Sequence, residues 1–240
     1  MINGTYRFAG KTVEIRSMHR LVHTMSRNYT SPHPAELVIE ITPTDIDFER
    51  KKSEGPCSDA YLETLAVYRK LAHALLPEDV LLFHASAVAV DGFGYLFTAV
   101  SGTGKSTHAG LWRQLFGSRA VMVNDDKPLL KIEEKRVTAF GTPWSGKHAL
   151  DTNTSVPVRA ICILRRAEHN SIREITPYEA LPMLLQQSYR PTDQKELVQT
   201  LHLVERMSEQ AELYELSCNM DVEAARLAYE TMSASACDER

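Results

Sequence analysis

A lysine–serine pair in a glycine-rich stretch, followed by two consecutive aspartates, gives this sequence its clearest chemistry. The stretch runs Ala99-Val-Ser-Gly-Thr-Gly-Lys-Ser-Thr107, and Asp125-Asp126 begins twenty positions after Lys105. Its two glycines permit a tight loop whose backbone N–H groups converge on phosphate oxygens. In such loops the lysine reaches the β- and γ-phosphates and the serine hydroxyl binds Mg²⁺. We therefore expect ATP to contact Ser101, Gly102, Thr103, Gly104, Lys105, Ser106 and Thr107.

The flanking sequence supports a phosphate-binding loop. An apolar strand is expected over Tyr95–Val100 and a helix over 106–115, so an anion in the loop would meet a helix N-terminus. The pattern departs from G-x-x-x-x-G-K-[ST] at its first position, which is Ala99. The alternative is a glycine-rich turn that only joins strand to helix. The Lys-Ser-Thr sequel and the paired aspartates favour the phosphate loop.

The second aspartate distinguishes between classes of nucleotide protein. Phosphoryl transfer needs positioned phosphates, a metal to spread charge and a group that orients the attacking oxygen. One aspartate can hold Mg²⁺ together with Ser106, and the other can accept the proton of an acceptor hydroxyl. A protein that only binds nucleotide needs at most one of them. The pair favours a kinase, but the sequence does not order the two roles, and a solvated Asp-Asp turn is the plain alternative.

Two further segments could contact the transferring phosphoryl group or its acceptor. His84 lies in an apolar run, where a lone histidine is more often structural than functional. The loop Gly141–His148 holds two glycines, a proline and a tryptophan, more than a simple hairpin requires. In it, Lys147 and His148 could stabilise moving charge and Trp144 could wall the acceptor site. A surface loop with a packed tryptophan is the alternative.

Composition places limits on the class of protein. The net charge of −4 gives no electrostatic footprint for nucleic acid or an anionic membrane. No apolar run approaches the ~20 residues that span a bilayer, and the N-terminus lacks a signal pattern, so a cytoplasmic protein is expected. The cysteines have neither zinc-site nor disulfide-framework spacing. They are Cys57, Cys162, Cys218 and Cys237, and Cys162 lies in an apolar run that predicts a core position.

Periodicity predicts strands and one long helix before the phosphate loop. An apolar face at helical spacing runs from Leu62 to Leu75, and a near-continuous apolar run from Val80 to Val90 predicts a buried strand. The turn residues 91–94 then favour a hairpin with the strand that enters the loop. Short strands are expected at 13–15, 36–41 and 45–48, and a loop or irregular strand at 17–34.

After the loop, strands give way to helices. Strands are expected over 120–126 and 156–164, with a hairpin of 129–132 and 137–140 between them. Thr176-Pro-Tyr-Glu179 is a capping box, Pro182 should kink the helix that follows, and Asp193 and Asp221 begin two more helices. We expect an α/β fold with a mixed, partly antiparallel sheet and a helical C-terminal part. The expected organisation is a single domain over 1–240, with a possible small β subdomain at 1–55, a nucleotide-binding core at 80–165 and helices at 176–236.

The order of these features resembles one family. A buried-strand His84-Ala-Ser, a hairpin into Ser-Gly-Thr-Gly-Lys-Ser, a short helix and Asn-Asp-Asp126 resemble the kinase domain of HPr kinase/phosphorylase, over roughly 80–165. The same P-loop fold forms the nucleotide core of ATP-dependent phosphoenolpyruvate carboxykinase. The resemblance looks closest to small, stand-alone relatives. It implies that Asp125 is the base, that Asp126 faces the metal and that His84 lies near the transferred phosphate.

After Ser106 the sequence has Thr107, where HPr kinases usually carry an acidic residue. It also lacks the Arg-Gly-rich signature that the family uses for phosphorylase activity. We therefore do not extend the resemblance to phosphorylation of the HPr protein or to its reversal. We expect a kinase that uses ATP and Mg²⁺ to phosphorylate a hydroxyl of a small molecule or a peptide. The alternatives are a carboxykinase-like enzyme, which would need clustered rather than scattered arginines, and a regulatory module that hydrolyses nucleotide slowly.

Overall fold

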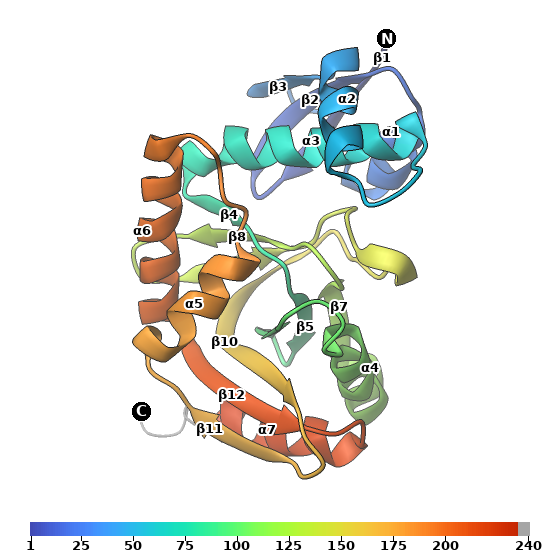
Figure 1. Ribbon diagram of the computed structural model, residues 1–240. Coiled ribbons are helices and arrows are strands. Elements are labelled where there is room, and N and C mark those ends of the chain that lie inside the picture. The colour runs from blue at the N-terminus through green and yellow to red at the C-terminus, as the bar shows by residue number, and fades with distance from the viewer. Residues whose placement is uncertain (235–240) are drawn as a thin grey trace.

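The computed structural model describes residues 1–234, which form a mixed α/β fold with two separate sheets (Figure 1). The smaller sheet has three strands in the order β1-β2-β3. The larger has nine, with β4-β8-β9-β10-β6-β5-β7 along one path and β12 and β11 added beside β10. The strands are β1 Ile2–Phe8, β2 Lys11–Ser17, β3 Leu37–Glu40, β4 Val80–Leu82, β5 Ser86–Val90, β6 Phe93–Thr98, β7 Ala120–Asn124, β8 Leu129–Ile132, β9 Val137–Phe140, β10 Ser155–Arg166, β11 Ser171–Glu174 and β12 Glu212–Cys218.

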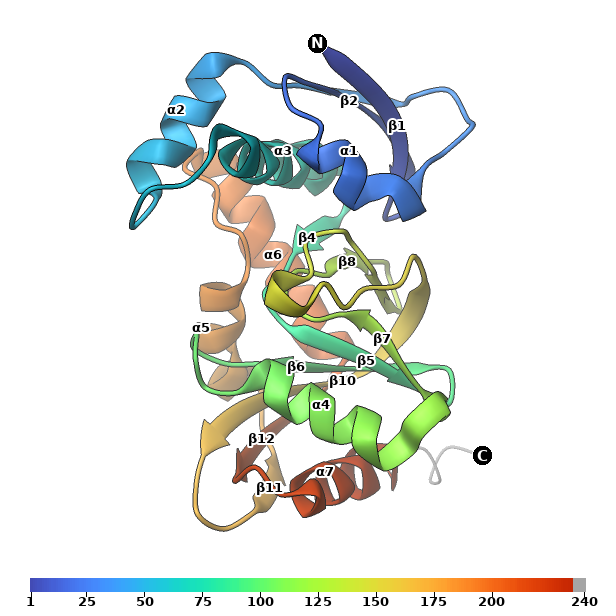
Figure 2. The same ribbon diagram turned by 90° about the vertical axis from the view of Figure 1, so that its right-hand side faces the viewer.

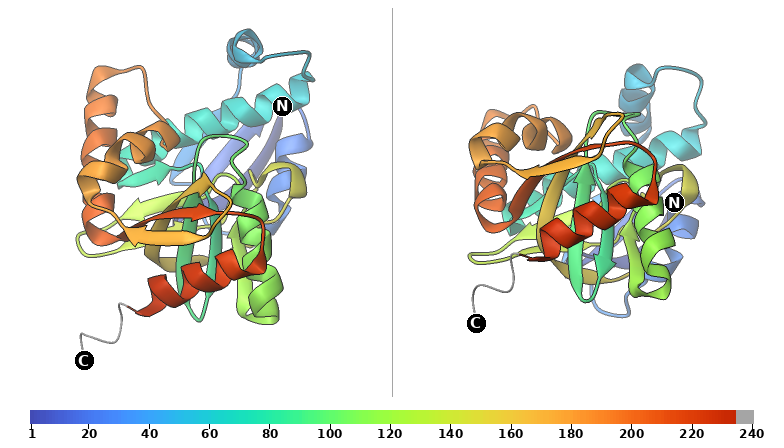
Figure 3. Two further views of the ribbon diagram at one scale, coloured as in Figure 1. Left: turned by 60° about the horizontal axis from the view of Figure 1, so that its bottom comes forward. Right: turned by 90° about the horizontal axis from the view of Figure 1, so that it is seen from below.

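Helices cover both faces of the larger sheet (Figures 2 and 3). α4 and α7 pack on one face and α5 and α6 on the other. None of the helices within residues 1–234 is both long and apolar enough to cross a membrane. The helices are α1 Leu21–Met25, α2 Pro43–Lys52, α3 Asp59–Leu75, α4 Lys105–Phe116, α5 Pro177–Gln187, α6 Gln194–Gln210 and α7 Val222–Ala234, with 3₁₀ turns at Ser26–Tyr29, Leu76–Glu78, Gly117–Arg119 and Gly146–His148.

Strand β10 organises the larger sheet. Its first residues pair antiparallel with β9, and its later residues run parallel to β6 on one side and β12 on the other. Ala160 and Cys162 face the α4 and α7 side, whereas Ile161 and Ile163 face the α5 and α6 side. Burial on both faces explains the continuous apolar sequence. Because β6, β10 and β12 are parallel, their C-terminal ends meet at one edge, where the glycine-rich loop 99–104 follows β6.

The N-terminal part packs its own core above the larger sheet (Figure 1). Helix α3 lies against the strands β1 to β3, and one apolar cluster runs from Tyr6 through Leu75 to residues of β4 and β8. Tyr29 Oη donates to Asp151, 2.7 Å away. This bond ties the N-terminal part to the loop that follows β9.

Several expected elements are confirmed. β5 and β6 form an antiparallel hairpin, as do β8 and β9. Thr176 caps α5 in a reciprocal box with Glu179, and Asp193 accepts from two backbone N–H groups at the start of α6. Pro182 lies inside α5, and α7 begins one residue after Asp221. The expected cysteine position Cys237 and residues 235–236 of the C-terminal segment lie outside the described residues.

Other expectations are wrong. Residues 45–48 belong to helix α2, because Thr42 and Asp45 form a capping box with Pro43 at the first helical position. The apolar run 80–90 is two strands, β4 and β5, which pair with different partners. The stretch 17–34 contains α1 and a 3₁₀ turn. The C-terminal part is not purely helical, because β11 and β12 extend the larger sheet.

Candidate active site

The loop from Ala99 to Gly104 joins β6 to α4 in the conformation that its glycines allow. Gly102 and Gly104 have φ values of 80° and 123°, which residues with a Cβ rarely adopt. Gly104 is the N-cap residue of α4, so the first-turn N–H groups of the helix point toward the loop. Positive φ values at two glycines and a helix that begins directly after them are the backbone features that a phosphate-binding loop requires.

Two basic side chains, those of Lys105 and Arg166, donate hydrogen bonds to backbone carbonyls of the loop. Lys105 is only 8% exposed, and its Nζ donates to the Ala99 carbonyl at 3.0 Å. Burial lowers the pKa of Lys105, and Asp126 partly opposes that shift. At the end of β10, Arg166 donates from Nε to the Thr103 carbonyl at 3.0 Å and from Nη2 to the Gly102 carbonyl. The guanidinium therefore holds the outer side of the loop.

Asp125 is a buried carboxylate held by serine hydroxyls. It is 5% exposed, and Ser86 Oγ donates to its Oδ1 at 2.9 Å and to its backbone carbonyl at 3.1 Å. Burial raises the pKa of Asp125, and hydrogen bonds from Ser86 and Ser106 partly counter the rise. The contact with Ser106 brings the end of β7 against the start of α4. The Ser106 hydroxyl and the Asp125 carboxylate, two candidate metal ligands, therefore lie together.

Asp126 has a different set of partners. His84 Nε2 lies 3.1 Å from its Oδ1, and Lys127 Nζ lies 3.0 Å from its Oδ2. Burial tends to raise the pKa of Asp126, but the hydrogen bond from His84 and the charge of Lys127 outweigh it, so the pKa is lowered. His84 is held in turn, because its backbone N–H donates to the Gln187 carbonyl at the end of α5 and its carbonyl accepts from Thr98.

Asn124 holds the turn after β7 and the loop beyond it. Its Oδ1 accepts from the backbone N–H groups of Asp126 and Lys127 at 2.8 and 2.5 Å. Its Nδ2 donates to the carbonyl and the hydroxyl of Thr142 at 2.9 and 3.0 Å. Asn124 is fully buried, and its two bonds to Thr142 are buried as well, whereas those to Asp126 and Lys127 are partly buried. The amide couples the turn 125–127 to the loop Gly141–His148.

The loop Gly141–His148 lies over the aspartates. A Cβ placed on Gly146 would be 3.2 Å from the Cβ of Asp126, and Gly146 has a φ of 71°. His148 is close enough to lower the pKa of Asp125 through its charge. Ser145 Oγ donates to Asp151 at 2.6 Å, which anchors the loop on the far side. Lys147 is exposed on the 3₁₀ turn beside His148.

Trp144 corrects one expectation. Its side chain is 5% exposed and packs among the N-terminal apolar residues, with its ring tilted against Phe8 and Tyr68. Its Nε1 donates to the Thr64 carbonyl at 3.0 Å. Trp144 is therefore a core residue that attaches the loop to α3, and it does not line an open acceptor site. The driving force is the burial of a large apolar ring whose single polar atom finds a partner.

Three residues of this region have partners that only the fold reveals. Ser86, Asn124 and Arg166 become recognisable only when the strands are paired, because their partners lie 39, 18 and 63 positions or so along the chain. In the sequence, Ser86 belongs to His84-Ala-Ser and Asn124 to Asn-Asp-Asp126, and these short patterns are the signals that point to them. From the sequence, Arg166 is a weaker candidate for a phosphate or acceptor contact, because a single arginine is more often a surface charge.

The donor atoms fit a magnesium ion. Ser106 offers a hydroxyl oxygen and Asp125 a carboxylate oxygen, and these hard oxygen ligands are the type that Mg²⁺ takes in nucleotide sites, together with phosphate oxygens and water. Within residues 1–234 there is no cluster of three or more His, Cys, Asp or Glu side chains that could hold a metal without such help.

Comparisons with known proteins place the chain in a family. The solved structure of the HPr(Ser) kinase/phosphatase from Coxiella burnetii matches with a TM-score of 0.37 and 12% identity, over 65% of this chain and 98% of that chain. No curated protein matches. The profile of the family described as SynChlorMet cassette protein ScmC matches residues 61–224. The chain belongs to the ScmC family of SynChlorMet cassette proteins.

Proposed function

We propose that this protein is a kinase that uses Mg-ATP to phosphorylate a hydroxyl group of a small molecule or a peptide. The proposal rests on one observation. The loop with Lys105 and Ser106 meets two aspartates at one edge of the sheet, and the two carboxylates have different hydrogen-bond partners. A protein that only binds nucleotide has no use for the second, separately oriented carboxylate. A kinase requires both a metal ligand and an acceptor for the hydroxyl proton.

The loop would bind the triphosphate. First-turn N–H groups of α4 and the loop amides supply donors for phosphate oxygens, and Lys105 supplies a positive charge. Lys105 Nζ donates to the Ala99 carbonyl, a neutral acceptor that a phosphate oxygen can replace with a stronger, charge-assisted bond. Arg166 would keep the outer side of the loop in place while the phosphates bind.

The contacts favour a definite order for the two aspartates. Asp125 accepts from Ser86 and lies against Ser106, so we assign Asp125 and Ser106 to Mg²⁺. Asp126 is held by His84, so we assign Asp126 to the acceptor hydroxyl. This order reverses the one that the family resemblance implies. The metal, when bound, would neutralise charge that develops on the phosphate oxygens.

The reaction then needs one proton transfer and one phosphoryl transfer. The acceptor oxygen forms a bond to the γ-phosphorus while the bond between that phosphorus and the β,γ-bridging oxygen breaks, and ADP leaves with the bond electrons. The hydroxyl proton passes to the carboxylate of Asp126. His84 fixes the orientation of that carboxylate, and Lys127 balances its charge before the proton arrives. Lys147 and His148 would stabilise charge on the moving phosphoryl group.

The proposal is tested by titrating Mg-ATP calorimetrically into the protein and into the Lys105→Ala variant. Lys195→Ala is the matched control, because Lys195 is an exposed lysine in the first turn of α6. We expect wild type and Lys195→Ala to bind equally and Lys105→Ala to lose binding, with thermal unfolding confirming that all three are folded. Unchanged binding by Lys105→Ala, or no binding by wild type, would contradict the phosphate-loop function.

A second pair of variants tests the order of the aspartates. Asp126→Asn should keep Mg-dependent ATP binding and lose phosphoryl transfer by ~10²-fold or more, because it removes the proton acceptor. Asp125→Asn should lose the Mg²⁺-dependent part of ATP binding. Equal binding defects in the two variants would mean that both carboxylates bind metal, and the case for a kinase would lose its main support.

A further inference from the structure

Asp151 lies where three parts of the molecule meet: the N-terminal part, the loop Gly141–His148 and strand β7. Its Oδ2 accepts from Tyr29 Oη at 2.7 Å, and its Oδ1 accepts from Ser145 Oγ at 2.6 Å. Its backbone pairs with Asn124, the last residue of β7, in an isolated bridge. This one residue therefore joins the N-terminal part to the two segments that flank the paired aspartates.

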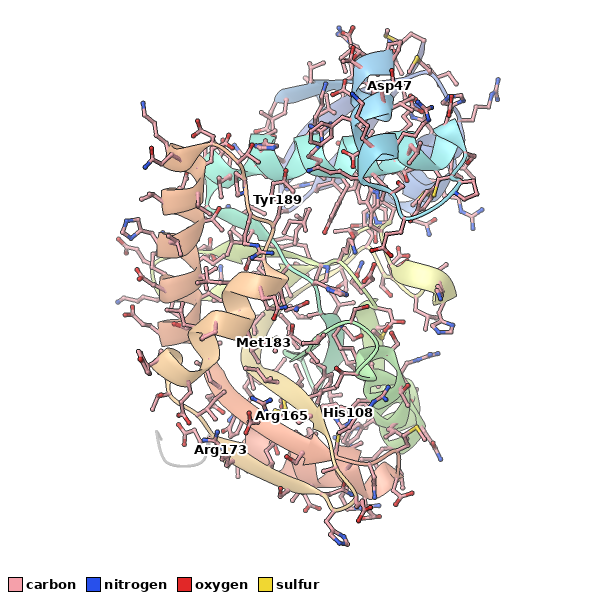
Figure 4. The ribbon with its side chains drawn as sticks, in the orientation of Figure 1. Asp47, His108, Arg165, Arg173, Met183 and Tyr189 are labelled. Atoms are coloured by element: carbon pink, nitrogen blue, oxygen red, sulfur yellow. The ribbon has the colours of Figure 1, made fainter. Side chains whose placement is uncertain are left out.

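The donor from the N-terminal part is a buried, neutral hydroxyl. The Tyr29 side chain is 1% exposed, and burial together with the hydrogen bond to Asp151 raises the pKa of Tyr29 far above its ordinary value, so the hydroxyl keeps its proton. A second bond runs beside the first, from Asn153 Nδ2 to the Asn28 carbonyl at 2.8 Å. Figure 4 shows the N-terminal part, marked by Asp47, above the yellow segment to which these bonds run. The segment is thus held at two points.

Ser145 connects Asp151 to the aspartate cluster. Its side chain is only 3% exposed, and a Cβ added to the next residue, Gly146, would lie 3.2 Å from the Cβ of Asp126. Close-packed segments transmit small displacements to their neighbours. A shift of Asp151 therefore moves Ser145 and Gly146 relative to Asp126, and sub-ångström shifts at a reacting group slow a reaction.

We propose that Tyr29 is a positioning residue, which through Asp151 holds the loop Gly141–His148 against Asp126 in the arrangement that phosphoryl transfer needs. The inference rests on the proposed function, and it makes the N-terminal part a component of the active site. Tyr29 lies outside residues 61–224, the range that matches the family, so that match does not imply this role.

The test compares two tyrosines of the same core. Tyr29→Phe removes only the hydroxyl, and Tyr6→Phe is its matched control, because Tyr6 is 4% exposed, its Oη bonds to His23 at 2.7 Å, and its ring, like that of Tyr29, packs against Phe8. Each variant loses one hydrogen bond, so both should lower the melting temperature by about 2–4 °C. Only Tyr29→Phe should slow ADP formation from Mg-ATP, by about tenfold, and speed hydrogen exchange in the loop 141–148.

A second variant tests whether Asp151 is the link. Ser145→Ala removes the other side-chain donor to its carboxylate and should also slow ADP formation. If both donors act through one carboxylate, the double variant should lose less than the product of the two single losses, whereas independent effects multiply. The calorimetric affinity for Mg-ATP should change less than about twofold in every variant, because the removed bonds do not involve the phosphate loop.

Equal ADP formation and equal hydrogen exchange in Tyr29→Phe and Tyr6→Phe would overturn the positioning role. Single losses that multiply in the double variant would overturn it too. So would a fall in Mg-ATP affinity as large as the fall in rate, because the hydroxyl would then serve nucleotide binding. Failure of the proposed function looks different, since the wild-type protein would then neither bind Mg-ATP nor form ADP from it.

Discussion

Replacing Gly146 with alanine tests whether the loop 141–148 acts on the aspartates. Gly146 has a φ of 71°, and an added Cβ would lie 3.2 Å from the Cβ of Asp126, so that one of the two must move by a few tenths of an ångström. The left-handed backbone costs a residue with a Cβ about 1–2 kcal/mol. The variant therefore carries two separable effects, backbone strain and displacement of Asp126.

Gly10→Ala is the matched control for strain. Gly10 has a φ of 88°, and its added Cβ would meet nothing within 4 Å. Both variants should lose about 1–2 kcal/mol, which lowers the melting temperature by roughly 2–4 °C per kcal/mol in a chain of this size. Only Gly146→Ala should also slow the reaction. A shift of a few tenths of an ångström predicts a loss of about tenfold, since ~1 Å of misplacement can cost ~10²-fold.

The assay follows ADP formation from Mg-ATP together with thermal unfolding for wild type and both variants. Comparable losses of melting temperature with reduced ADP formation in Gly146→Ala alone would support the account. Full activity in Gly146→Ala, at a melting temperature like that of Gly10→Ala, would refute the idea that this loop controls the position of Asp126.

Three further predictions concern stability. Trp144→Ala should destabilise the fold by about 3–5 kcal/mol in denaturant titration, because it empties a buried aromatic site and removes a buried hydrogen bond to the Thr64 carbonyl; a loss below about 1 kcal/mol would contradict its core role. Burial raises the pKa of Asp125, so its charge opposes folding above the folded-state pKa. Asp125→Asn should therefore raise the melting temperature at pH 7, with the gain shrinking as the pH falls through that pKa; a lower melting temperature would contradict this sign. Burial tends to raise the pKa of Asp45, but Lys70 and hydrogen bonds at the helix cap lower it to about 2. Its stabilisation should be complete above its ordinary pKa of 3.8 and be lost as the pH falls toward 2, and Asp45→Asn should remove that part of the acid transition.

Local signals in the sequence predict local structure well. Thr176 and Glu179 predict the start of α5, because a capping box satisfies backbone donors within four residues. Thr42 and Asp45 form the same motif at α2, yet alternating apolar residues there favour a strand on periodicity alone. Where a cap and a short alternation compete, the cap is the stronger physical signal, because it satisfies donors that would otherwise be unpaired.

Long-range pairing is what the sequence does not show. β12 runs parallel to β10 across a separation of about fifty residues, and nothing local in Glu212–Cys218 identifies that partner. The same holds in the candidate site. The loop glycines, Lys105 and the paired aspartates follow from spacing, whereas the contacts of Asp125 with Ser86 and of Arg166 with the loop depend on which strands become neighbours.

The most direct test of the proposed function is a crystal structure with Mg²⁺ and a non-hydrolysable ATP analogue. We expect the triphosphate in the loop with Lys105 on its β- and γ-phosphates, Mg²⁺ bound by Ser106 and facing Asp125, and Asp126 beside the γ-phosphate. Lys147 should then lie within about 10 Å of the γ-phosphate, roughly one Debye length at ~0.1 M salt. A triphosphate bound elsewhere, or one whose γ-phosphate points away from both aspartates, would contradict the account.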